Sequence, residues 1–400
     1  MLMPEMCIEK IIAFLEEVEL EKSSTGSRSW WRSKNMKKIL LGLVLALGLA
    51  ACGDKAEAPK ENEKPVVKIG VLYPMSGNAA FFGDGAKNAT ELFFSKFNEK
   101  EAKFKYEILW EDTQANPAKA VLAVRKLIDY DKVDVVLDAF SSVGNAVSPI
   151  TNEKKTPHLT FAQDRSISNG FYNYRVVTST KKTGQKMIEA LKARNLHNIV
   201  GVVENTAGTL SLYNGFSVSA RKDANINILD TVEVNPGEKD FNIILQKINN
   251  LQPDAVVVSL QAPEVDIFMK QAKQNELKMP IVGIQSFSFL KDKKLAEDYW
   301  YVDVAFADKN FLSDYKKTFG EDITNFAENF YTLLQVVVNN YETFVSENKP
   351  SAEDFINNMS SVNNIISPLG QLNLDKEEQN VDSEASIRLI KDGKIVEIEE

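Results

Sequence analysis

The feature that most constrains the fold of this chain is an alternation of β-rich runs and amphipathic helical stretches that occurs twice. In the first series, the expected strands are 66–72, 106–110, 133–137 and 157–161, and the expected helices are 86–97, 117–130 and 144–155. In the second series, the expected strands are 199–203, 228–234, 254–258 and 281–284, and the expected helices are 212–225, 240–250 and 265–275. Such alternation is typical of parallel sheets with helices on both faces. The sequence therefore predicts an α/β fold with two doubly wound parallel-sheet lobes.

Polar segments directly follow several of the expected strands. They are Ser76-Gly77, Ser141-Ser142, Ala162-Gln163-Asp164 and Gln285-Ser286. In open parallel sheets, ligands bind outside the carboxyl ends of the strands. Two lobes that face one another would place these ends on opposite sides of a cleft, so these segments are the candidate ligand-binding positions.

Cys52 ends a stretch that has the pattern of a bacterial export signal. Lys37 and Lys38 form a positive n-region, residues 39–51 form an apolar h-region, and small residues precede the cysteine. The apolar run is shorter than the about 20 residues that a membrane-spanning helix needs. The Leu-Ala-Ala-Cys ending resembles the lipobox of bacterial lipoproteins, whose signal is cut before a cysteine that is then lipidated. We therefore expect a lipoprotein signal peptide at 36–51 and a lipid on Cys52; an ordinary signal peptide with a chance cysteine is the alternative.

The segments on either side of this signal differ from the rest of the chain. Residues 1–35 do not fit an export signal, so we expect translation to begin at Met36 and residues 1–35 to be a non-native upstream extension. A cytoplasmic helix before an uncleaved anchor is the alternative. After the cysteine, residues 53–65 contain no apolar side chain larger than alanine, which predicts a flexible tether at 52–65. The remainder is long enough for two domains of typical size.

Charge and composition exclude several classes of function. The formal net charge is −9 and the lysines are dispersed, so the chain lacks the basic stripe that nucleic-acid binding requires. No cysteine follows Cys52, so stability must come from core burial without a disulfide. His158 and His197 stand alone without metal-ligand spacing, and neither a nucleophile elbow nor a phosphate loop occurs. We expect no metal, no cofactor and no enzymatic activity.

A set of short motifs occurs in order from Val66 to the end of the chain. They are Ile69-Gly70-Val71, Met75-Ser76-Gly77, Phe82-Gly83-Asp84, Asn116-Pro117, Ser141-Ser142, Pro236-Gly237-Glu238-Lys239-Asp240-Phe241, Pro368-Leu369-Gly370 and Asp392-Gly393-Lys394. The stretch 236–241 is the most specific. Together, in this order and at these spacings, the motifs resemble those of periplasmic solute-binding proteins of the branched-chain amino acid type.

This resemblance implies a type I periplasmic-binding fold, in which two lobes joined by three crossovers close on a small ligand for an ABC importer. We expect the crossovers near Thr178, Ala305 and Ser367. Lobe 1 would then comprise residues 66–179 and 306–367, and lobe 2 would comprise residues 180–305 and 368–400. The implied partners are a small-molecule ligand, an ABC permease, and a bacterial membrane through the lipid anchor. The protein itself would be an extracytoplasmic monomer.

The resemblance also implies roles for residues at the strand ends of lobe 1. Ser142 matches a serine that holds the α-carboxylate of an amino acid, a group that a helix N-terminus favours, and Ser141 is a further candidate. A plain helix cap is the alternative. Ala162 matches a residue whose carbonyl accepts from the ligand ammonium. Asp164 stands where the family has a threonine, and an ionised aspartate only accepts hydrogen bonds.

The aspartate leaves two possibilities open. Either Asp164 binds an ammonium group, or the ligand is not a simple α-amino acid. A solvated loop carboxylate paired with Arg165 is the structural alternative.

Three further candidates follow from the same resemblance. Gln285 matches the acidic residue that binds the ammonium group, but it has no charge. Gln261 matches a position that is often aromatic, which suggests a more polar pocket than leucine needs. Phe82 matches an aromatic lid residue, with ordinary packing as the alternative. Residues 206–214 form a region longer than the family's corresponding loop.

Two hypotheses of function remain at this point. The first is a lipid-anchored solute-binding component of an ABC importer that binds an amino acid or a related carboxylate or amide. The second is a sensor or regulator of a cell-envelope enzyme that uses the same fold, because a decayed pocket would show the departures at Asp164, Gln285 and Gln261.

Overall fold

The structure is a computed structural model that describes residues 64–77, 79–323, 326–345 and 348–398. The expected upstream extension, the expected signal peptide and Cys52 lie outside the described residues, as does nearly all of the expected tether. No helix in these described ranges is long and apolar enough to cross a membrane.

Strands and helices alternate along most of the described chain. The strands are β1 (Val66–Tyr73), β2 (Lys105–Asp112), β3 (Val135–Asp138), β4 (His158–Thr160), β5 (Asn173–Val176), β6 (Asn198–Glu204), β7 (Asn227–Val234), β8 (Ala255–Ser259), β9 (Ile281–Ile284), β10 (Trp300–Val304), β11 (Ile365–Ser367), β12 (Gly370–Asp375), β13 (Asn380–Asp382), β14 (Ala385–Lys391) and β15 (Lys394–Ile398). The α-helices are α3 (Phe81–Lys96), α4 (Pro117–Arg125), α5 (Ser141–Glu153), α6 (Thr180–Ala193), α7 (Ala207–Ala220), α8 (Asn242–Leu251), α9 (Glu264–Gln274), α10 (Lys309–Phe319), α11 (Ala327–Glu342) and α12 (Ala352–Asn357). Short 3-10 or π-helical turns are η2 (Lys126–Asp131), η3 (Arg165–Ser168), η4 (Ser286–Ser288), η5 (Lys293–Ala296) and η6 (Asn358–Val362).

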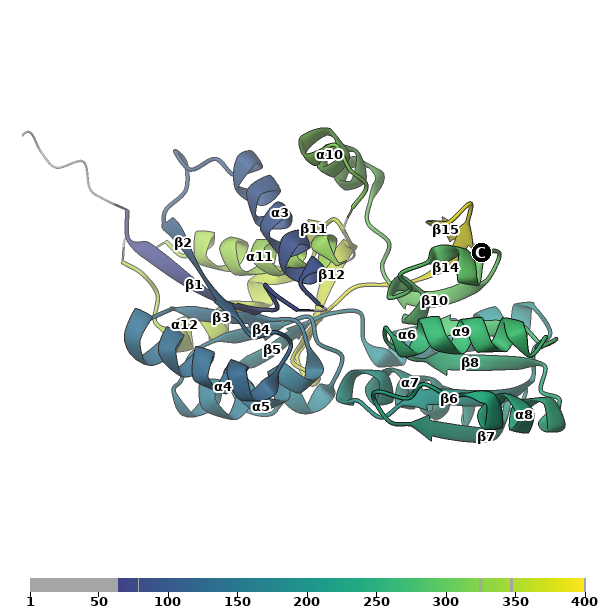
Figure 1. Cartoon of the computed structure of the whole chain (residues 1–400). Coiled ribbons are helices and arrows are strands. Elements are labelled where there is room, and N and C mark those ends of the chain that lie inside the picture. Colours follow the sequence, from purple (N-terminus) through teal and green to yellow (C-terminus); the bar gives the residue numbers. More distant parts are fainter. Residues whose placement is uncertain (1–63, 78, 324–325, 346–347, 399–400) are drawn as a thin grey trace, which may run out of the picture. The chain divides into compact units, whose positions relative to one another are not determined.

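The strands form two sheets (Figure 1). Within the described residues, the first sheet has eight strands in the order β11-β12-β13-β5-β4-β3-β1-β2, and the second has seven in the order β15-β14-β10-β9-β8-β6-β7. Strands β1 to β5 pair in parallel, as do β6 to β10. At one edge, β13 adds to β5 in parallel and is followed by the antiparallel strands β12 and β11, while the antiparallel strands β14 and β15 extend the second sheet from β10. The predicted α/β fold with two parallel-sheet lobes is confirmed.

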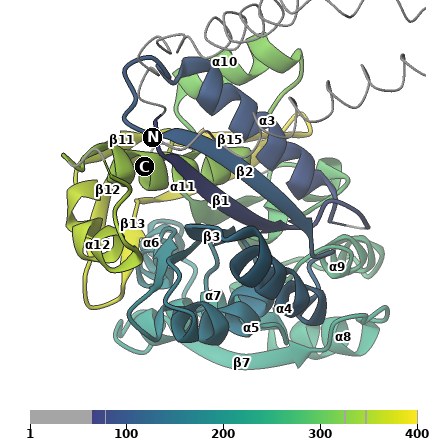
Figure 2. The same cartoon turned by 90° about the vertical axis from the view of Figure 1, so that its left-hand side faces the viewer.

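Side chains that alternate along the strands fill a core on each face of each sheet. In β1, Val71 packs in the core beneath α3 and α11, whereas Leu72 packs in the core beneath α4 and α5. Figure 2 shows these two helix pairs on opposite sides of β1 to β3. In β6, Val202 likewise belongs to the core with α8 and α9, and Val203 to the core with α6 and α7. Burial on both faces explains why these strands are apolar at almost every position.

Helices α6 and α7 approach each other closely at two glycines. A Cβ atom added to Gly184 would lie 2.3 Å from the carbonyl oxygen of Gly215, and one added to Gly215 would lie 2.2 Å from the carbonyl oxygen of Thr180. Only residues without a side chain allow the two backbones this spacing.

The chain passes between the two sheets three times. It leaves the first sheet between β5 and α6, returns between β10 and α10, and leaves again between β13 and β14. The prediction of a third crossover near Ser367, with all of 368–400 in lobe 2, is wrong because β12 and β13 belong to the first sheet. Val381 of β13 pairs in parallel with Val176 of β5, and its side chain is buried in the first core. At the corrected crossover, the hydroxyls of Thr178 and Ser383 are hydrogen bonded at 2.7 Å.

Candidate functional site

A cavity of about 330 Å³ lies at the carboxyl ends of strands from both sheets. The first lobe contributes the start of α3, the start of α5 and the loop after β4. The second lobe contributes the start of α7, the loop after β8 and the end of β9. The lining residues are Phe82, Ala139, Phe140, Ser141, Ser142, Phe161, Ala162, Gln163, Thr206, Ala207, Gly208, Thr209, Leu212, Leu260, Gln261, Ile284, Gln285, Phe289 and Phe326. This is the position where a doubly wound sheet binds its ligands.

The candidate residues from the sequence divide into two groups. Six of them line this cavity, namely Phe82, Ser141, Ser142, Ala162, Gln261 and Gln285. Asp164 is not among the lining residues. Direct contact of the six with a ligand stays a prediction.

The start of α5 presents unpaired donors to the cavity. Phe140 occupies the N-cap position and provides no side-chain cap, so the first N–H groups of the helix lack the partner that a serine or aspartate cap would supply. Ser142 is exposed, and its hydroxyl has no hydrogen-bond partner among the described residues. The predicted plain helix cap is therefore not the role of Ser142, since the helix begins one residue earlier.

Ser141 has a structural role beside Ser142. Its Oγ accepts hydrogen bonds from the backbone N–H groups of Gln163 and Asp164, each at 3.2 Å. At the beginning of the loop after β4, the hydroxyl of Thr160 accepts a hydrogen bond from the N–H of Ala162 at 3.1 Å and donates one to the buried carboxylate of Asp138. These bonds hold the loop after β4 against the start of α5, so that Ala162 and Gln163 face the cavity.

Gln163 lines the cavity as well, and it belongs to the candidate segment Ala162-Gln163-Asp164, although the resemblance implies no individual role for it. Its side chain is only 6% exposed, and its Oε1 atom has no hydrogen-bond partner among the described residues. An unpaired buried amide costs free energy unless a ligand or a water satisfies it. Its position directly after a strand is the signal that identifies it.

Phenylalanines form an apolar wall of the cavity. The ring of Phe326 stacks on that of Phe82 at 5.4 Å and on that of Phe161 at 5.8 Å between centroids, and lies 5.5 Å from Phe289. Phe82 also contacts Phe140 edge-on at 4.9 Å. Such pairs are favourable beyond the area that they bury. Phe82 therefore has the ordinary packing role and also lines the cavity, while its role as an aromatic lid stays a prediction.

Two lining residues have a left-handed backbone that is unusual for residues with side chains. They are Gln285, with φ of 60°, and Phe326, with φ of 67°. This conformation costs about 1–3 kcal/mol, and it often occurs where the surrounding structure fixes a side chain for function. Gln285 is held by Asp303, whose Oδ1 atom accepts from its Nε2 at 3.1 Å. Asp303 in turn forms a buried ion pair with Arg388 at 3.1 Å.

In the second lobe, the loop after β8 is held in place by hydrogen bonds to the buried side chains of Glu204 and Ser286. The N–H of Gln261 donates to Oε2 of Glu204 at 2.8 Å, and burial raises the pKa of that carboxyl. The N–H of Leu260 donates to the hydroxyl of Ser286 at 2.8 Å. Leu260 and Gln261 are thereby positioned at the end of β8.

The region 206–214 is helical rather than a loop. Thr206 caps α7 by accepting from the N–H of Thr209, a cap that the threonine itself could have indicated. The start of α7 lies next to the start of α5, because a Cβ added to Gly208 would lie 3.4 Å from Ser141 Oγ. Two helix N-termini, one from each lobe, therefore meet at the cavity.

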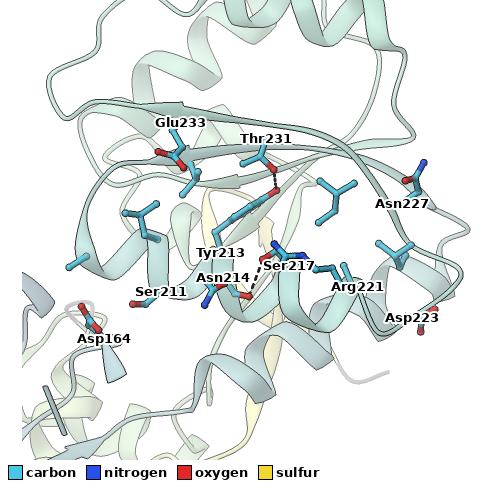
Figure 3. Close-up of a pocket in the computed structure, with 16 residues that line it drawn as sticks. Asp164, Ser211, Tyr213, Asn214, Ser217, Arg221, Asp223, Asn227, Thr231 and Glu233 are labelled. Carbon is cyan, nitrogen blue, oxygen red and sulfur yellow. Dashed lines mark hydrogen bonds between the residues drawn. The ribbon is translucent and has the colours of Figure 1, made fainter. Parts of the chain in front are cut away.

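Asp164 lies at the end of a separate groove of about 930 Å³ that runs along α7 and β7 (Figure 3). Its carboxylate accepts hydrogen bonds from Asn145 Nδ2 at 2.7 Å and from the N–H of Ser166 at 2.9 Å. The expected alternative pair with Arg165 does not form among the described residues, because Arg165 is paired with Glu378 at 2.9 Å. The groove adjoins the cavity, since Ala207 lines both. We prefer the smaller cavity as the candidate site, because its wall comes from the strand ends of both lobes, whereas the groove runs along α7 and β7 of the second lobe.

No group of three or more His, Cys, Asp or Glu side chains in the described part of the chain is placed to hold a metal ion. The lining residues of the cavity offer hydrogen bonding, helix-terminal electrostatics and apolar contact.

Comparison with known proteins gives one family. The model of the family described as "Periplasmic binding protein" matches residues 66–394. A Leu/Ile/Val-binding protein homolog of Brucella abortus is 25% identical over 258 residues, which are 63% of this chain and 63% of that protein. The chain thus spans less than two thirds of the length of that curated relative.

Several solved structures have the same fold as this chain. A leucine-binding protein from Thermotoga maritima has a TM-score of 0.73 at 19% identity, over 83% of this chain and 98% of that one. A solute-binding protein of an ABC transporter from R. palustris, in complex with benzoate, has a TM-score of 0.73 at 20% identity, over 83% and 95% of the two chains. At these identities the likeness concerns the fold.

Proposed function

The chain belongs to the periplasmic binding protein family, and we propose that it is the lipid-anchored solute-binding component of an ABC importer, with a small carboxylate as its ligand. The observation that supports this function best is a cavity whose wall comes from the strand ends of both lobes. A ligand in this cavity contacts both lobes at once, so its binding favours the closed conformation of the two lobes. Hinge closure of this kind converts ligand binding into a change of shape that a permease can recognise.

The start of α5 supports a carboxylate as the bound group. An uncapped helix N-terminus favours a negative charge, and the free hydroxyl of Ser142 adds a donor. The leucine named for the T. maritima protein and the benzoate of the R. palustris complex share a carboxylate group.

We propose that six residues contact this ligand. Ser142 and Ser141 lie at the carboxylate, Ala162 and Gln285 beside it, and Phe82 and Gln261 along the body of the ligand. Asp164 is left out of the proposed set, because its carboxylate is bonded to Asn145 and Ser166 outside the cavity.

The lipid anchor and the location complete the proposed function. A lipid on Cys52 and a tether at 52–65 would keep a monomeric binding protein on the outer side of a bacterial membrane. From there it would present the ligand to a permease in the inner membrane. The family of the chain supports the extracytoplasmic location.

A ligand screen tests the proposed function. Calorimetry and thermal shift with amino acids, simple carboxylic acids and small amides should reveal at least one ligand, which at 100 times its Kd stabilises the protein by about 2.7 kcal/mol. A blank screen, together with capture of a defined cell-envelope enzyme, would instead favour the regulatory alternative.

Replacement of Ser142 tests where the ligand binds. Ser142→Ala should weaken binding of the ligand found in the screen at least tenfold, because it removes a donor from a charged acceptor. Ser211→Ala is the matched control, since Ser211 lies on α7 in the groove of Figure 3 and not in the cavity. If Ser211→Ala weakened binding and Ser142→Ala did not, the ligand would occupy the groove and the proposed site would be wrong.

A further inference from the structure

The candidate cavity has no charged wall. None of its described lining residues has an ionisable side chain; the polar ones are serine, threonine and glutamine. A buried ammonium group without an anionic partner costs several kcal/mol, so a cavity built for an α-amino acid needs a carboxylate.

Three carboxylates bonded to residues of this wall already have partners. Asp164, whose N–H donates to Ser141, accepts from Asn145 Nδ2 at 2.7 Å and from the N–H of Ser166 at 2.9 Å. Asp303 is paired with Arg388 at 3.1 Å, and it also accepts from Ser288 Oγ at 2.5 Å and from Gln285 Nε2 at 3.1 Å. Glu204 accepts from the N–H of Gln261 at 2.8 Å, and burial raises its pKa, which disfavours its charged form. None of these carboxylates belongs to the lining of the cavity, so none is placed to serve as the counter-ion of a bound ammonium.

Donors for a carboxylate are present in the same cavity. The start of α5 has no side-chain cap, and the hydroxyl of Ser142 has no partner among the described residues. Gln163 provides a second, independent indication of a ligand, because it lines the cavity and its buried Oε1 atom has no hydrogen-bond partner among the described residues. Rotation of this amide by half a turn presents its NH₂ group instead, so that Gln163 can donate to a carboxylate or accept from a ligand hydroxyl.

The body of the ligand faces aromatic rings. Phe82, Phe140, Phe161, Phe289 and Phe326 all line the cavity. Their stacked and edge-on pairs leave ring faces and edges as the contact surface, which fits a flat apolar group. A volume of about 330 Å³ is at the small end of ordinary ligand pockets.

We propose that this site selects a carboxylate that has an aromatic or other apolar body and no ammonium group. The proposal rests on the proposed function and narrows its ligand class. It also explains why a glutamine at 285 is compatible with binding, since an acid at that position would repel the carboxylate.

Pairs of compounds that differ only in the ammonium group give the test. Calorimetry on the protein, freed of bound small molecules by unfolding and refolding, would compare 3-phenylpropanoate with phenylalanine and 4-methylpentanoate with leucine. We expect at least one acid to bind ten times more tightly than its amino acid, and the amide 3-phenylpropanamide to bind more weakly than the acid. Tighter binding of the amino acids would overturn the inference and leave the proposed function standing. If no compound of this set or of the wider screen bound, both would fall.

A charge introduced at Gln163 tests the same inference from the side of the protein. Gln163→Glu introduces a carboxylate of the same shape as the glutamine side chain. It should weaken binding of the two carboxylic acids at least tenfold, and it should reduce or reverse the protein's preference for each carboxylic acid over the matching amino acid. Gln274→Glu is the matched control, because Gln274 is exposed at the end of α9 and outside the cavity, and it should leave both affinities unchanged. Equal effects of the two variants, or tighter binding of the acids by Gln163→Glu, would overturn the proposal.

Discussion

Glu328 provides a stability prediction that depends on pH. It lies in the first turn of α11, its side chain is 6% exposed, and its Oε2 atom has no hydrogen-bond partner among the described residues. Burial raises the pKa of Glu328 from 4.5 to about 7; the positive charge of Arg388 lowers it less, and Asp303 raises it slightly. Arg388 does not neutralise Glu328 fully, because its guanidinium is paired with Asp303 and donates to the carbonyls of Val304 and Ala305.

The size and sign of the effect follow from this shift. A folded-state pKa of about 7 against 4.5 when unfolded is equivalent to about 3 kcal/mol at about 1.4 kcal/mol per pKa unit. The folded protein keeps a proton that the unfolded chain releases between these two values. The contribution is therefore fully present below pH 4.5 and is lost as the pH rises through about 7.

The variant Glu328→Gln isolates this contribution, because glutamine keeps the shape of the side chain and does not titrate. Urea unfolding at several pH values from 4.5 to 8, followed by fluorescence and circular dichroism, gives the free energy of unfolding of both proteins. We expect the wild type to lose about 3 kcal/mol relative to the variant across this range. Glu91→Gln, at an exposed position of α3, should leave the pH dependence as in the wild type. A difference between wild type and Glu328→Gln that stays constant with pH would refute the reasoning.

Three further predictions concern packing, charge and the anchor. Gly184→Ala should lower the free energy of unfolding by about 1–3 kcal/mol, because the new methyl group would meet the carbonyl of Gly215, and an unchanged melting temperature would contradict this. Arg388→Met should cost about 3–5 kcal/mol in urea unfolding, since it leaves Asp303 buried without its partner, whereas a loss below 1 kcal/mol would show that this carboxylate is otherwise neutralised. Cys52→Ser should move the protein from the membrane fraction to the aqueous fraction of the producing bacterium and abolish its labelling by a fatty-acid probe; retention of both would contradict lipidation at this residue.

The fold could be predicted where local pattern determines it. Strands such as β1 and β8 are buried on both faces, so their apolar composition is visible in a short window of sequence. The third crossover could not be predicted in this way. The pairing of Val381 with Val176 joins segments far apart in the chain, and short strands such as β13 have no local pattern that favours one sheet over the other.

The candidate site could be predicted only in part, for a similar reason. Ser142, Ala162 and Gln285 line the cavity because each follows a strand, and this relation is visible in the sequence. Phe326 precedes a helix instead, and its ring reaches the cavity through the packing of α11. Asp164 also follows a strand, but hydrogen bonds from Asn145 and Ser166 direct its carboxylate elsewhere.

The late position of the third crossover has a consequence for how this protein can be made. The first sheet contains β11 to β13 and the second contains β14 and β15, so both sheets include strands from the last part of the chain. During synthesis, neither lobe can complete its sheet until these residues have left the ribosome. Until then, β1 to β5 and β6 to β10 can already pair with one another, but each sheet lacks the late strands that complete one of its edges.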